Sequence, residues 1–289
     1  MSTTIHNSTS KSILITGCSS GIGLHCAHEL KNRGYRVFAT ARNTQDVDNL
    51  LQAGFESVQL DLDDSESIQS AVNWVLEQTN GQLDALFNNG AYGQPGAVED
   101  LTRDALRKQF ETNVFGTSEL TNLVLKTMRK QGYGRIVQNS SILGFVALPF
   151  RGAYNASKFA LEGLTDTLRL ELKGSDIHIS LIEPGPITSA FRQNALKALH
   201  QNVDMDNSFH QQGYKNALAR LSATDKQAAF TLGPEAVAKR LIHALESNNP
   251  KARYYVTFPT YLMGYLKRIL PTKWLDVCLL GSDDEVKTK

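Results

Sequence analysis

The sequence predicts a single α/β domain built on a doubly wound parallel sheet with helices on both faces. Two observations favour this fold. Short apolar, partly β-branched runs alternate with amphipathic segments across residues 12–256, and a glycine-rich turn follows the first run. Parallel strands need a crossover between them, usually a helix, and this gives the alternation. A chain of 289 residues is long enough to bury one sizeable core of this kind.

Composition and charge exclude several other classes of protein. Lys and Arg number 30 against 29 Asp and Glu, with no long basic run, so neither nucleic acid nor an anionic membrane is favoured as a partner. The three cysteines have no metal-ligand spacing, which indicates a reducing compartment. Residues 1–10 lack the apolar core of a signal peptide and are expected to be a disordered lead-in. No run approaches the ~20 apolar residues of a membrane span. We therefore expect a soluble, cytoplasmic protein.

The glycine-rich turn lies between the first predicted strand, residues 12–16, and an amphipathic segment over residues 24–33. Its glycines are Gly17, Gly21 and Gly23. Such a turn lets backbone N–H groups and a helix N-terminus face a pyrophosphate without obstruction by a Cβ. The spacing G-x-x-x-G-x-G differs from the commoner G-x-G-x-x-G, but its place between strand and helix predicts a nucleotide site.

The end of the second predicted strand, residues 36–40, favours a phosphorylated cofactor. Folds that bind the unphosphorylated dinucleotide usually place an acid here for the ribose 2′-OH. This chain has Ala41 followed by Arg42. An arginine would bind a 2′-phosphate through charge-assisted, forked hydrogen bonds. The alternative is a solvated surface arginine. We favour phosphate binding because the acid is missing and a base is present.

Two further strand ends carry polar residues suited to the adenosine half of a cofactor. Asp61 ends the third predicted strand, residues 58–61, where ligands bind in open parallel sheets, and it could accept from an adenine amino group. Its alternative role is to cap the next helix, although Asp64 and Ser65 stand closer for that. The fourth strand, residues 83–87, leads into residues 88–91, where small and amide side chains can approach a ribose and brace the sheet. A plain turn fits that spacing almost as well.

Tyr154 and Lys158 are four residues apart in a run whose apolar residues recur at helical intervals, so both lie on one helix face. A phenol has a reference pKa of ~10 and is a poor acid or base near neutrality. A neighbouring ammonium favours the phenolate and is expected to lower the pKa of Tyr154. An ordinary surface Tyr/Lys pair has the same spacing, so the interpretation depends on the residues around it.

Two more polar residues stand where chemistry would need them. Asn113 lies within a long helical stretch, residues 101–130, and is a poor helix former, so it is either exposed or kept for a polar contact. Ser141 follows the fifth predicted strand, residues 134–139, and precedes Tyr154 by 13 residues. This places a hydroxyl at a strand's carboxyl edge beside the start of the Tyr154 helix. A turn serine that bonds its own backbone is the alternative.

These motifs together resemble the classical short-chain dehydrogenase/reductase family. The resemblance runs from about residue 12 to residue 188, with the family's last helix and strand at residues 234–256. It is carried by Thr16-Gly17-x-x-x-Gly21-x-Gly23, Asn88-Asn89-Gly90-Ala91, Asn113, Ser140-Ser141, Tyr154-x-x-x-Lys158 and Pro184-Gly185. Where the family commonly has Asn-Asn-Ala-Gly, this chain swaps the last two residues, which should shift the turn only locally. The resemblance implies a Rossmann-type sheet of about seven strands.

The resemblance also implies a role for each matching residue. Tyr154 would be the general acid/base, and Lys158 would lower its pKa and hold the nicotinamide ribose. Ser141 would hydrogen-bond the substrate oxygen beside Tyr154, and Asn113 would hold a water linking Lys158 to solvent. The hydride chemistry belongs to the cofactor, expected to be NADP(H). The expected cofactor contacts are Gly17, Ser19, Ser20, Gly21, Ile22, Gly23, Arg42, Asp61, Leu62, Asn88, Gly90, Tyr154, Lys158, Pro184, Gly185, Ile187 and Thr188.

Two segments lie outside these motifs. Residues 186–232 are a long insertion, either a lid over the substrate or a surface excursion, and we favour a lid because it follows the presumed nicotinamide border. Its apolar residues and those of 145–150 suggest an apolar substrate. His200 and His210 lack partner ligands, so we expect no metal site. Residues 259–289 form an amphipathic tail that could cover the pocket, form a subunit contact or lie on a membrane; packing on its own domain is favoured.

The sequence thus predicts one catalytic domain over residues 11–258 that interconverts a carbonyl and an alcohol on an apolar substrate. The aromatic tail and the segments around Tyr154 resemble the retinoid-, steroid- and aldehyde-active branch of the family. The family's usual assembly implies a homodimer or homotetramer through the helices that hold Asn113 and Tyr154. The alternatives are a non-catalytic dinucleotide-binding regulator on the same fold, an NAD-dependent alcohol dehydrogenase, and a peripheral membrane protein that acts through its tail.

Overall fold

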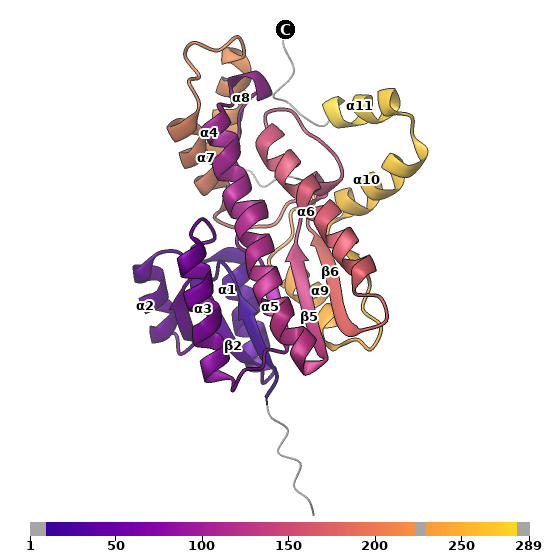
Figure 1. Ribbon diagram of the computed structural model, residues 1–289. Helices are drawn as coiled ribbons and strands as arrows, with labels where there is room; N and C mark the ends of the chain where they lie inside the picture. The colour runs from indigo at the N-terminus through magenta and orange to yellow at the C-terminus, as the bar shows by residue number, and fades with distance from the viewer. Residues whose placement is uncertain (1–9, 223–228, 282–289) are drawn as a thin grey trace, which may run out of the picture.

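The computed structural model describes residues 10–222 and 229–281, which form a parallel seven-stranded sheet with helices on both faces (Figure 1). The predicted doubly wound α/β fold is confirmed. The elements, in chain order, are β1 (Ser12–Ile15), α1 (Gly21–Asn32), β2 (Arg36–Ala41), α2 (Thr44–Gln52), β3 (Glu56–Gln59), α3 (Ser65–Gln78), β4 (Ala85–Asn88), η1 (Val98–Asp100), α4 (Arg103–Phe110), η2 (Glu111–Gly116), α5 (Thr117–Gln131), β5 (Tyr133–Asn139), η3 (Ile142–Gly144), α6 (Gly152–Glu171), β6 (Asp176–Glu183), α7 (Phe191–Asn202), α8 (Gln211–Ser222), α9 (Glu235–Glu246), β7 (Arg253–Tyr255), α10 (Phe258–Ile269) and α11 (Thr272–Gly281).

The strand order β3-β2-β1-β4-β5-β6-β7 makes β1 the point where the winding reverses. Ile15 of β1 pairs with Ala39 of β2 on one side and with Phe87 of β4 on the other. The crossovers that leave the carboxyl ends of β1 and β4 therefore run to opposite faces of the sheet. In open α/β sheets, ligands bind in the crevice that this divergence leaves outside the strand ends.

Each face of the sheet is covered by its own layer of helices. Buried apolar residues of α1, α2 and α9 pack on one face, and those of α3 and α5, with the partly buried Leu168 of α6, pack on the other. The central strands β1 and β4 are mostly apolar and buried along their whole length, as expected when both faces of a parallel sheet are covered. These two cores hold the strand ends that carry the site.

Two local features refine the predicted elements. The third strand ends at Gln59, so Asp61 lies two residues beyond it, and the side chain of Asp64 caps α3 by accepting from the Glu66 N–H at 2.9 Å. The capping role is thus carried by Asp64, as the spacing favoured. The predicted long helix is α4 and α5 joined by a π-helical turn, η2, which contains Asn113. Such turns occur often at functional sites.

The insertion and the tail flank the start of α6 above the carboxyl edge of the sheet (Figure 1). In the insertion, α7 and α8 pack against α4 and the start of α6. Tyr214 of α8 anchors them, because its buried hydroxyl donates to Asp100 Oδ2 at 2.6 Å and accepts from the Ala97 N–H at 2.9 Å. In the tail, α10 and α11 pack on the loop that follows Ser141. The tail therefore lies on its own domain, the arrangement that the sequence favoured.

Some predicted features fall on residues outside the description. These are the lead-in except Ser10, residues 223–228 of the insertion and residues 282–289 of the tail. Within the described part of the chain, none of the helices is long and apolar enough to pass through a bilayer.

Substitution by alanine should have opposite effects on stability at two glycines in helical segments. A Cβ on Gly116 would overlap the carbonyl oxygen of Leu62, whereas nothing lies within 4 Å of a Cβ on Gly163. We expect Gly116→Ala to lower the free energy of unfolding by roughly 1–3 kcal/mol, because the backbones must separate. Gly163→Ala should raise it by about 0.5–1 kcal/mol through helix propensity. Urea unfolding of both variants tests this, and equal midpoints would contradict it.

Candidate active site

Most of the predicted site residues lie where β1, β4, β5 and β6 end, whereas Arg42, Asp61 and Leu62 follow β2 and β3. The hydroxyl of Thr16, just after β1, accepts from the N–H groups of Asn89 and Gly90, just after β4, at 2.9 and 2.7 Å. The N–H of Ile142, after β5, donates to the carbonyl of Pro184, after β6, at 2.8 Å. These bonds hold the strand ends together at one edge of the sheet.

The glycine-rich turn has the backbone geometry of an anion cradle. Gly17 and Gly21 have φ angles of 68° and 58°, which favour glycine, and a Cβ on Gly23 would overlap the Gly17 carbonyl oxygen. No described acceptor binds the N–H groups of Gly21, Ile22 and Gly23 in the first turn of α1. The Ser20 side chain makes no cap hydrogen bond there either. A pyrophosphate fits these open N–H groups.

Asn89, which belongs to the predicted motif but was not among the expected cofactor contacts, is the amide that fixes this turn. Its Nδ2 donates to the carbonyl oxygens of Thr16 and Gly17 at 3.0 and 3.1 Å, and its Oδ1 accepts from Asn139. Asn88, the predicted contact, is 4% exposed and donates to Thr121 Oγ1 on α5 at 2.9 Å. Asn88 therefore braces the sheet against α5. The sequence signals for Asn89 were its place in the motif at residues 88–91 and its amide side chain at a strand end.

The predicted phosphate ligand, Arg42, is exposed at the end of β2. Its carbonyl accepts from Gln59 Nε2 at 2.9 Å, while no acidic side chain of the described residues forms an ion pair with its guanidinium. Its charge nevertheless lowers the pKa of Asp63 somewhat against a larger rise caused by burial. Asp61 accepts from the Asp63 N–H at 3.1 Å, and Leu62 lies beside Gly90. Arg42 therefore has donors available at this end of the site.

Tyr154, Ser141 and Lys158 lie together at the start of α6. Lys158 is 2% exposed, and its ammonium donates to the carbonyl of Asn139 at 2.7 Å. It lies 5.7 Å from the centre of the Tyr154 ring. The Ser141 side chain hydrogen-bonds Tyr154 and also accepts from the Leu143 N–H at 3.1 Å. The hydroxyl, phenol and ammonium predicted from two separate motifs are thus brought together.

The pKa values differ from the expectation that Lys158 lowers that of Tyr154. Burial raises the pKa of Tyr154 to about 12, and the Ser141 hydrogen bond opposes this only in part. Burial also lowers the pKa of Lys158 to about 8, while the charge of Glu162 acts in the opposite direction. The reason is that both groups have lost water and the ammonium is directed at Asn139. Tyr154 consequently keeps its proton at neutral pH in this structure.

Asn113 is buried, with 1% of its surface exposed. Of the two interpretations of the sequence, an exposed residue or one kept for a polar contact, the structure therefore supports the polar contact. Asn113 Nδ2 donates to the Tyr92 carbonyl at 3.1 Å and to Ser157 Oγ at 3.0 Å, and its Oδ1 accepts from the Tyr92 N–H at 3.3 Å. Asn113 thereby ties the π-helical turn to α6 one residue before Lys158. The water that the family resemblance implies for Asn113 stays a prediction.

The presumed nicotinamide border, residues 184–188, is fixed by segments from later in the chain. A Cβ on Gly185 would overlap Thr257 Oγ1. Ile187 forms a β-bridge with Leu232, and the Thr188 N–H donates to the Leu232 carbonyl at 3.0 Å. Both ends of the insertion therefore meet at this border.

Apolar side chains from the insertion and the tail surround Tyr154. The Phe191 ring of α7 contacts the Tyr154 ring edge-on, with centroids 5.3 Å apart. On the other side, Leu279 of α11 packs on Leu143 and Val146 after Ser141, with Tyr154 and Met263 at the border of this cluster. An apolar molecule bound beside Tyr154 would contact both segments.

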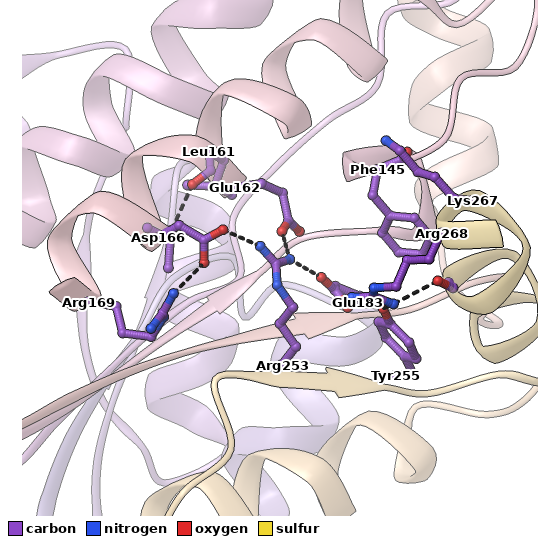
Figure 2. A network of polar contacts seen from close by, with 12 residues as sticks. Phe145, Leu161, Glu162, Asp166, Arg169, Glu183, Arg253, Tyr255, Lys267 and Arg268 are labelled. Carbon is purple, nitrogen blue, oxygen red and sulfur yellow. Dashed lines mark hydrogen bonds and ion pairs between the residues drawn. The ribbon is translucent and has the colours of Figure 1, made fainter. Parts of the chain in front are cut away.

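Figure 2 shows an unpredicted charged network around Arg253, which includes Glu162, the residue whose charge acts on Lys158. Glu162, one turn along α6, and Glu183, the last residue of β6, are 6% and 0% exposed. Arg253 of β7 contacts both with Nη1 and binds Asp166 with Nη2 at 2.6 Å. Glu162 could have been noticed because it is four residues past Lys158. Glu183 and Arg253 have no local signal, because they meet only when β6 and β7 pair.

The two buried carboxyl groups share one proton near neutrality. Burial raises the pKa of both, and the charge of Glu162 is the second cause of a rise to about 8 at Glu183. Glu162 Oε1 and Glu183 Oε2 have no hydrogen-bond partner among the described residues, so a proton on one carboxyl removes the repulsion between two buried negative charges. Arg253 therefore faces roughly one full buried negative charge from this pair, in addition to Asp166.

Comparison with known proteins agrees with this geometry. Residues 11–200 match the family model for short chain dehydrogenase. The chain is 42% identical to the uncharacterized oxidoreductase YbbO of Escherichia coli, over 94% of each chain. It is 36% identical to human 17-beta-hydroxysteroid dehydrogenase type 1, over 85% of this chain and 77% of that protein.

Solved structures give the same result. A short-chain dehydrogenase from Streptomyces avermitilis superposes with a TM-score of 0.73 at 28% identity, covering 96% of this chain and 100% of that one. An actinorhodin polyketide ketoreductase with NADPH superposes with a TM-score of 0.69 at 27% identity, covering 86% of this chain and 95% of that one. The chain belongs to the short-chain dehydrogenase family of oxidoreductases, whose members bind NAD or NADP.

The shared proton predicts how stability depends on pH. The folded-state pKa of Glu183 is raised from its ordinary 4.5 to about 8, so the folded protein binds the extra proton between these values. The stability that this gives is complete below about pH 4.5 and is lost as the pH rises through about 8. Glu183→Gln mimics the protonated form. We expect it to gain stability relative to the unmutated protein between pH 5 and 8, on the order of 1–3 kcal/mol.

Thermal unfolding across this pH range measures the difference. Asp166→Asn is the matched control, because Asp166 binds the same Arg253 from a partly exposed position. Parallel pH curves for Glu183→Gln and the unmutated protein would contradict the shared proton.

Proposed function

We propose that this protein is an NADP(H)-dependent oxidoreductase that interconverts a carbonyl group and an alcohol on an apolar substrate. The observation that carries the proposal is the cluster of Ser141, Tyr154 and Lys158 at the strand ends that also hold the open glycine turn. A dinucleotide-binding regulator needs the turn but has no use for the cluster. The NADP preference, the substrate class and a cytoplasmic location are all part of this proposal.

The bound cofactor would supply the hydride equivalent; the residues of the chain handle the proton and the oxygen. In reduction, Tyr154 donates its proton to the carbonyl oxygen, and it removes the hydroxyl proton in the reverse direction. Its high pKa suits the donor role, because the phenol is protonated at neutral pH. Ser141 hydrogen-bonds the same oxygen and stabilises its developing charge. Lys158 stabilises the phenolate that remains.

The supporting structure keeps these groups in position. Asn113 binds Ser157, which adjoins Lys158 on α6. Glu162 balances the Lys158 charge, and Asn139 receives its hydrogen bond. The first turn of α1 would hold the pyrophosphate, and residues 184–188 would border the nicotinamide.

The apolar surroundings of Tyr154 support the substrate class. Phe191, Leu279 and Met263 are apolar and come from segments outside the sheet. The names of two relatives, 17-beta-hydroxysteroid dehydrogenase type 1 and retinol dehydrogenase 8, describe enzymes of bulky apolar alcohols. We therefore expect a bulky apolar alcohol or carbonyl compound as substrate.

Tyr154→Phe tests the chemistry. The variant keeps the ring and its packing on Phe191 but loses the proton that is transferred. We expect turnover to fall by about 10²-fold or more, with cofactor affinity unchanged by nicotinamide fluorescence titration. Tyr92→Phe is the control, because only the Tyr92 backbone bonds Asn113. Near-normal turnover in Tyr154→Phe would refute the mechanism.

Arg42→Ala tests the cofactor preference. We expect the unmutated protein to bind NADPH more tightly than NADH, and Arg42→Ala to weaken NADPH binding by about tenfold, the loss of one charge-assisted contact. NADH affinity should not change. Arg33→Ala, which breaks a surface ion pair with Glu246, controls for net charge. A preference for NADH would favour the alternative that the protein is an NAD-dependent alcohol dehydrogenase. Binding of neither cofactor would contradict the proposal that it is an oxidoreductase of this kind.

A further inference from the structure

A basic hollow lies at the edge strand β7, between α9 and α10, away from the glycine turn. Its volume is about 280 Å³. The side chains that line it are Arg240, His243, Lys251, Arg253, Tyr254, Tyr255, Tyr261, Tyr265 and Arg268. Five of the nine are basic residues, four are tyrosines and none is acidic.

The positive charge of this hollow is largely unpaired. Arg253 is neutralised from behind by Glu162, Glu183 and Asp166 (Figure 2). In the described part of the chain, no acidic group forms an ion pair with Arg240, Lys251 or Arg268. Arg240, Lys251 and Arg268 thus line one hollow in a protein whose net charge is only +1. Bringing them together costs free energy unless an anion is bound.

Two of the cations are held in place by phenol groups instead of carboxylates. Arg268 Nη1 donates to the Tyr255 hydroxyl at 3.1 Å, and Arg240 Nη2 donates to the Tyr261 hydroxyl at 3.2 Å. The Tyr255 and Tyr261 rings pack edge-on, 5.4 Å apart, so they link α9, β7 and α10. Each guanidinium has five N–H donors and keeps several for a ligand.

The packing of α10 on β7 depends on a glycine. A Cβ on Gly264 would overlap the Tyr255 ring, so the absence of a side chain lets α10 approach the strand. The Gly264 carbonyl also accepts from Arg268 Nη1 at 2.7 Å. The hollow is therefore formed by specific packing of the two elements, and its charged side chains are positioned by it.

We propose that this hollow is a second anion site, which binds the phosphate group of a phosphate monoester. A dianion matches the three cations that line the hollow, and the planar Arg240 and Arg268 forks suit phosphate oxygens. The hollow is larger than a bare phosphate, and the tyrosine rings give an apolar surface for the group that carries it. The proposal stands apart from the proposed enzyme activity, because it uses none of the catalytic residues.

The hollow is well separated from the proposed cofactor phosphate site. Arg42 follows β2, next to the edge strand β3, whereas the hollow lies at β7, the opposite edge of the sheet. A phosphate bound at one edge cannot contact the other. The two sites can therefore be distinguished by substitution.

Isothermal titration of the full chain with phenyl phosphate at constant ionic strength tests the proposal. We expect Arg240→Gln and Arg268→Gln each to weaken binding by about tenfold, as for loss of a charge-assisted contact. Arg42→Ala should leave this affinity unchanged. Lys239→Gln is the matched control, since Lys239 adjoins Arg240 on α9 but lines a different hollow with Glu235 and Glu29.

Binding to lipid vesicles distinguishes a phosphate on a lipid headgroup from one on a soluble ester. Co-sedimentation with phosphatidylcholine vesicles that contain phosphatidic acid, lost in both arginine variants, would assign the site to a lipid headgroup. Titration without co-sedimentation would assign it to a soluble ester. The two substituted arginines lie on different helices, so misfolding of one variant leaves the other as a test. The proposal is overturned if neither probe binds at millimolar concentration, or if binding is lost in Arg42→Ala and kept in both arginine variants.

Discussion

The ammonium group of Lys158 is buried beside the ends of four strands, and the surrounding structure offsets the cost of burying it. An unpaired charge in a protein interior is strongly destabilising. Here the Asn139 carbonyl accepts its hydrogen bond at 2.7 Å, and Glu162 supplies an opposite charge one turn away. The pKa of Lys158 still falls to about 8, so the compensation is incomplete. The pKa of a buried lysine in this state changes with any nearby change of charge.

This requirement connects distant parts of the chain. Glu162 is itself buried and needs Arg253, which also binds Glu183 at the end of β6. Buried ion pairs add little net stability, but they leave an uncompensated charge when one partner is displaced. The last strand is therefore tied to the centre of the site. In the same way, Asn89 ties the end of β4 to the glycine turn after β1.

The sequence predicted features that depend on local spacing. The helical face shared by Tyr154 and Lys158, the open glycine turn and the Asp64 cap all follow from residues within a few positions of one another, and the structure has all three. Features set by long-range packing were not predictable. No local sequence pattern indicates that Glu183 and Arg253 form an ion pair. Asn88 and Asn89 are both amides at the end of β4, but the Asn88 side chain is directed at α5 and the Asn89 side chain at the glycine turn.

The predicted direction of the Tyr154 pKa shift was wrong for a similar reason. Helical spacing places Lys158 beside the phenol, but it does not show how much water the folded chain removes from either group. Burial proved the larger effect at both residues. Phe191 of the insertion and the cluster around Leu279 of the tail both pack beside Tyr154, and neither packing follows from helical spacing.

The separation between the residues of the strand ends and the helices that pack beside Tyr154 has an evolutionary consequence. Phe191 and Leu279, which lie on either side of Tyr154, belong to helices outside the sheet: α7 lies between β6 and α9, and α11 follows β7. Under the proposed function, mutations in α7 or α11 would change the shape and size of the molecules admitted without altering the buried lysine or the glycine turn. Gene duplicates of such a chain can diverge in substrate range while inheriting one unchanged mechanism. Laboratory selection for new substrates would do well to randomise these two helices first.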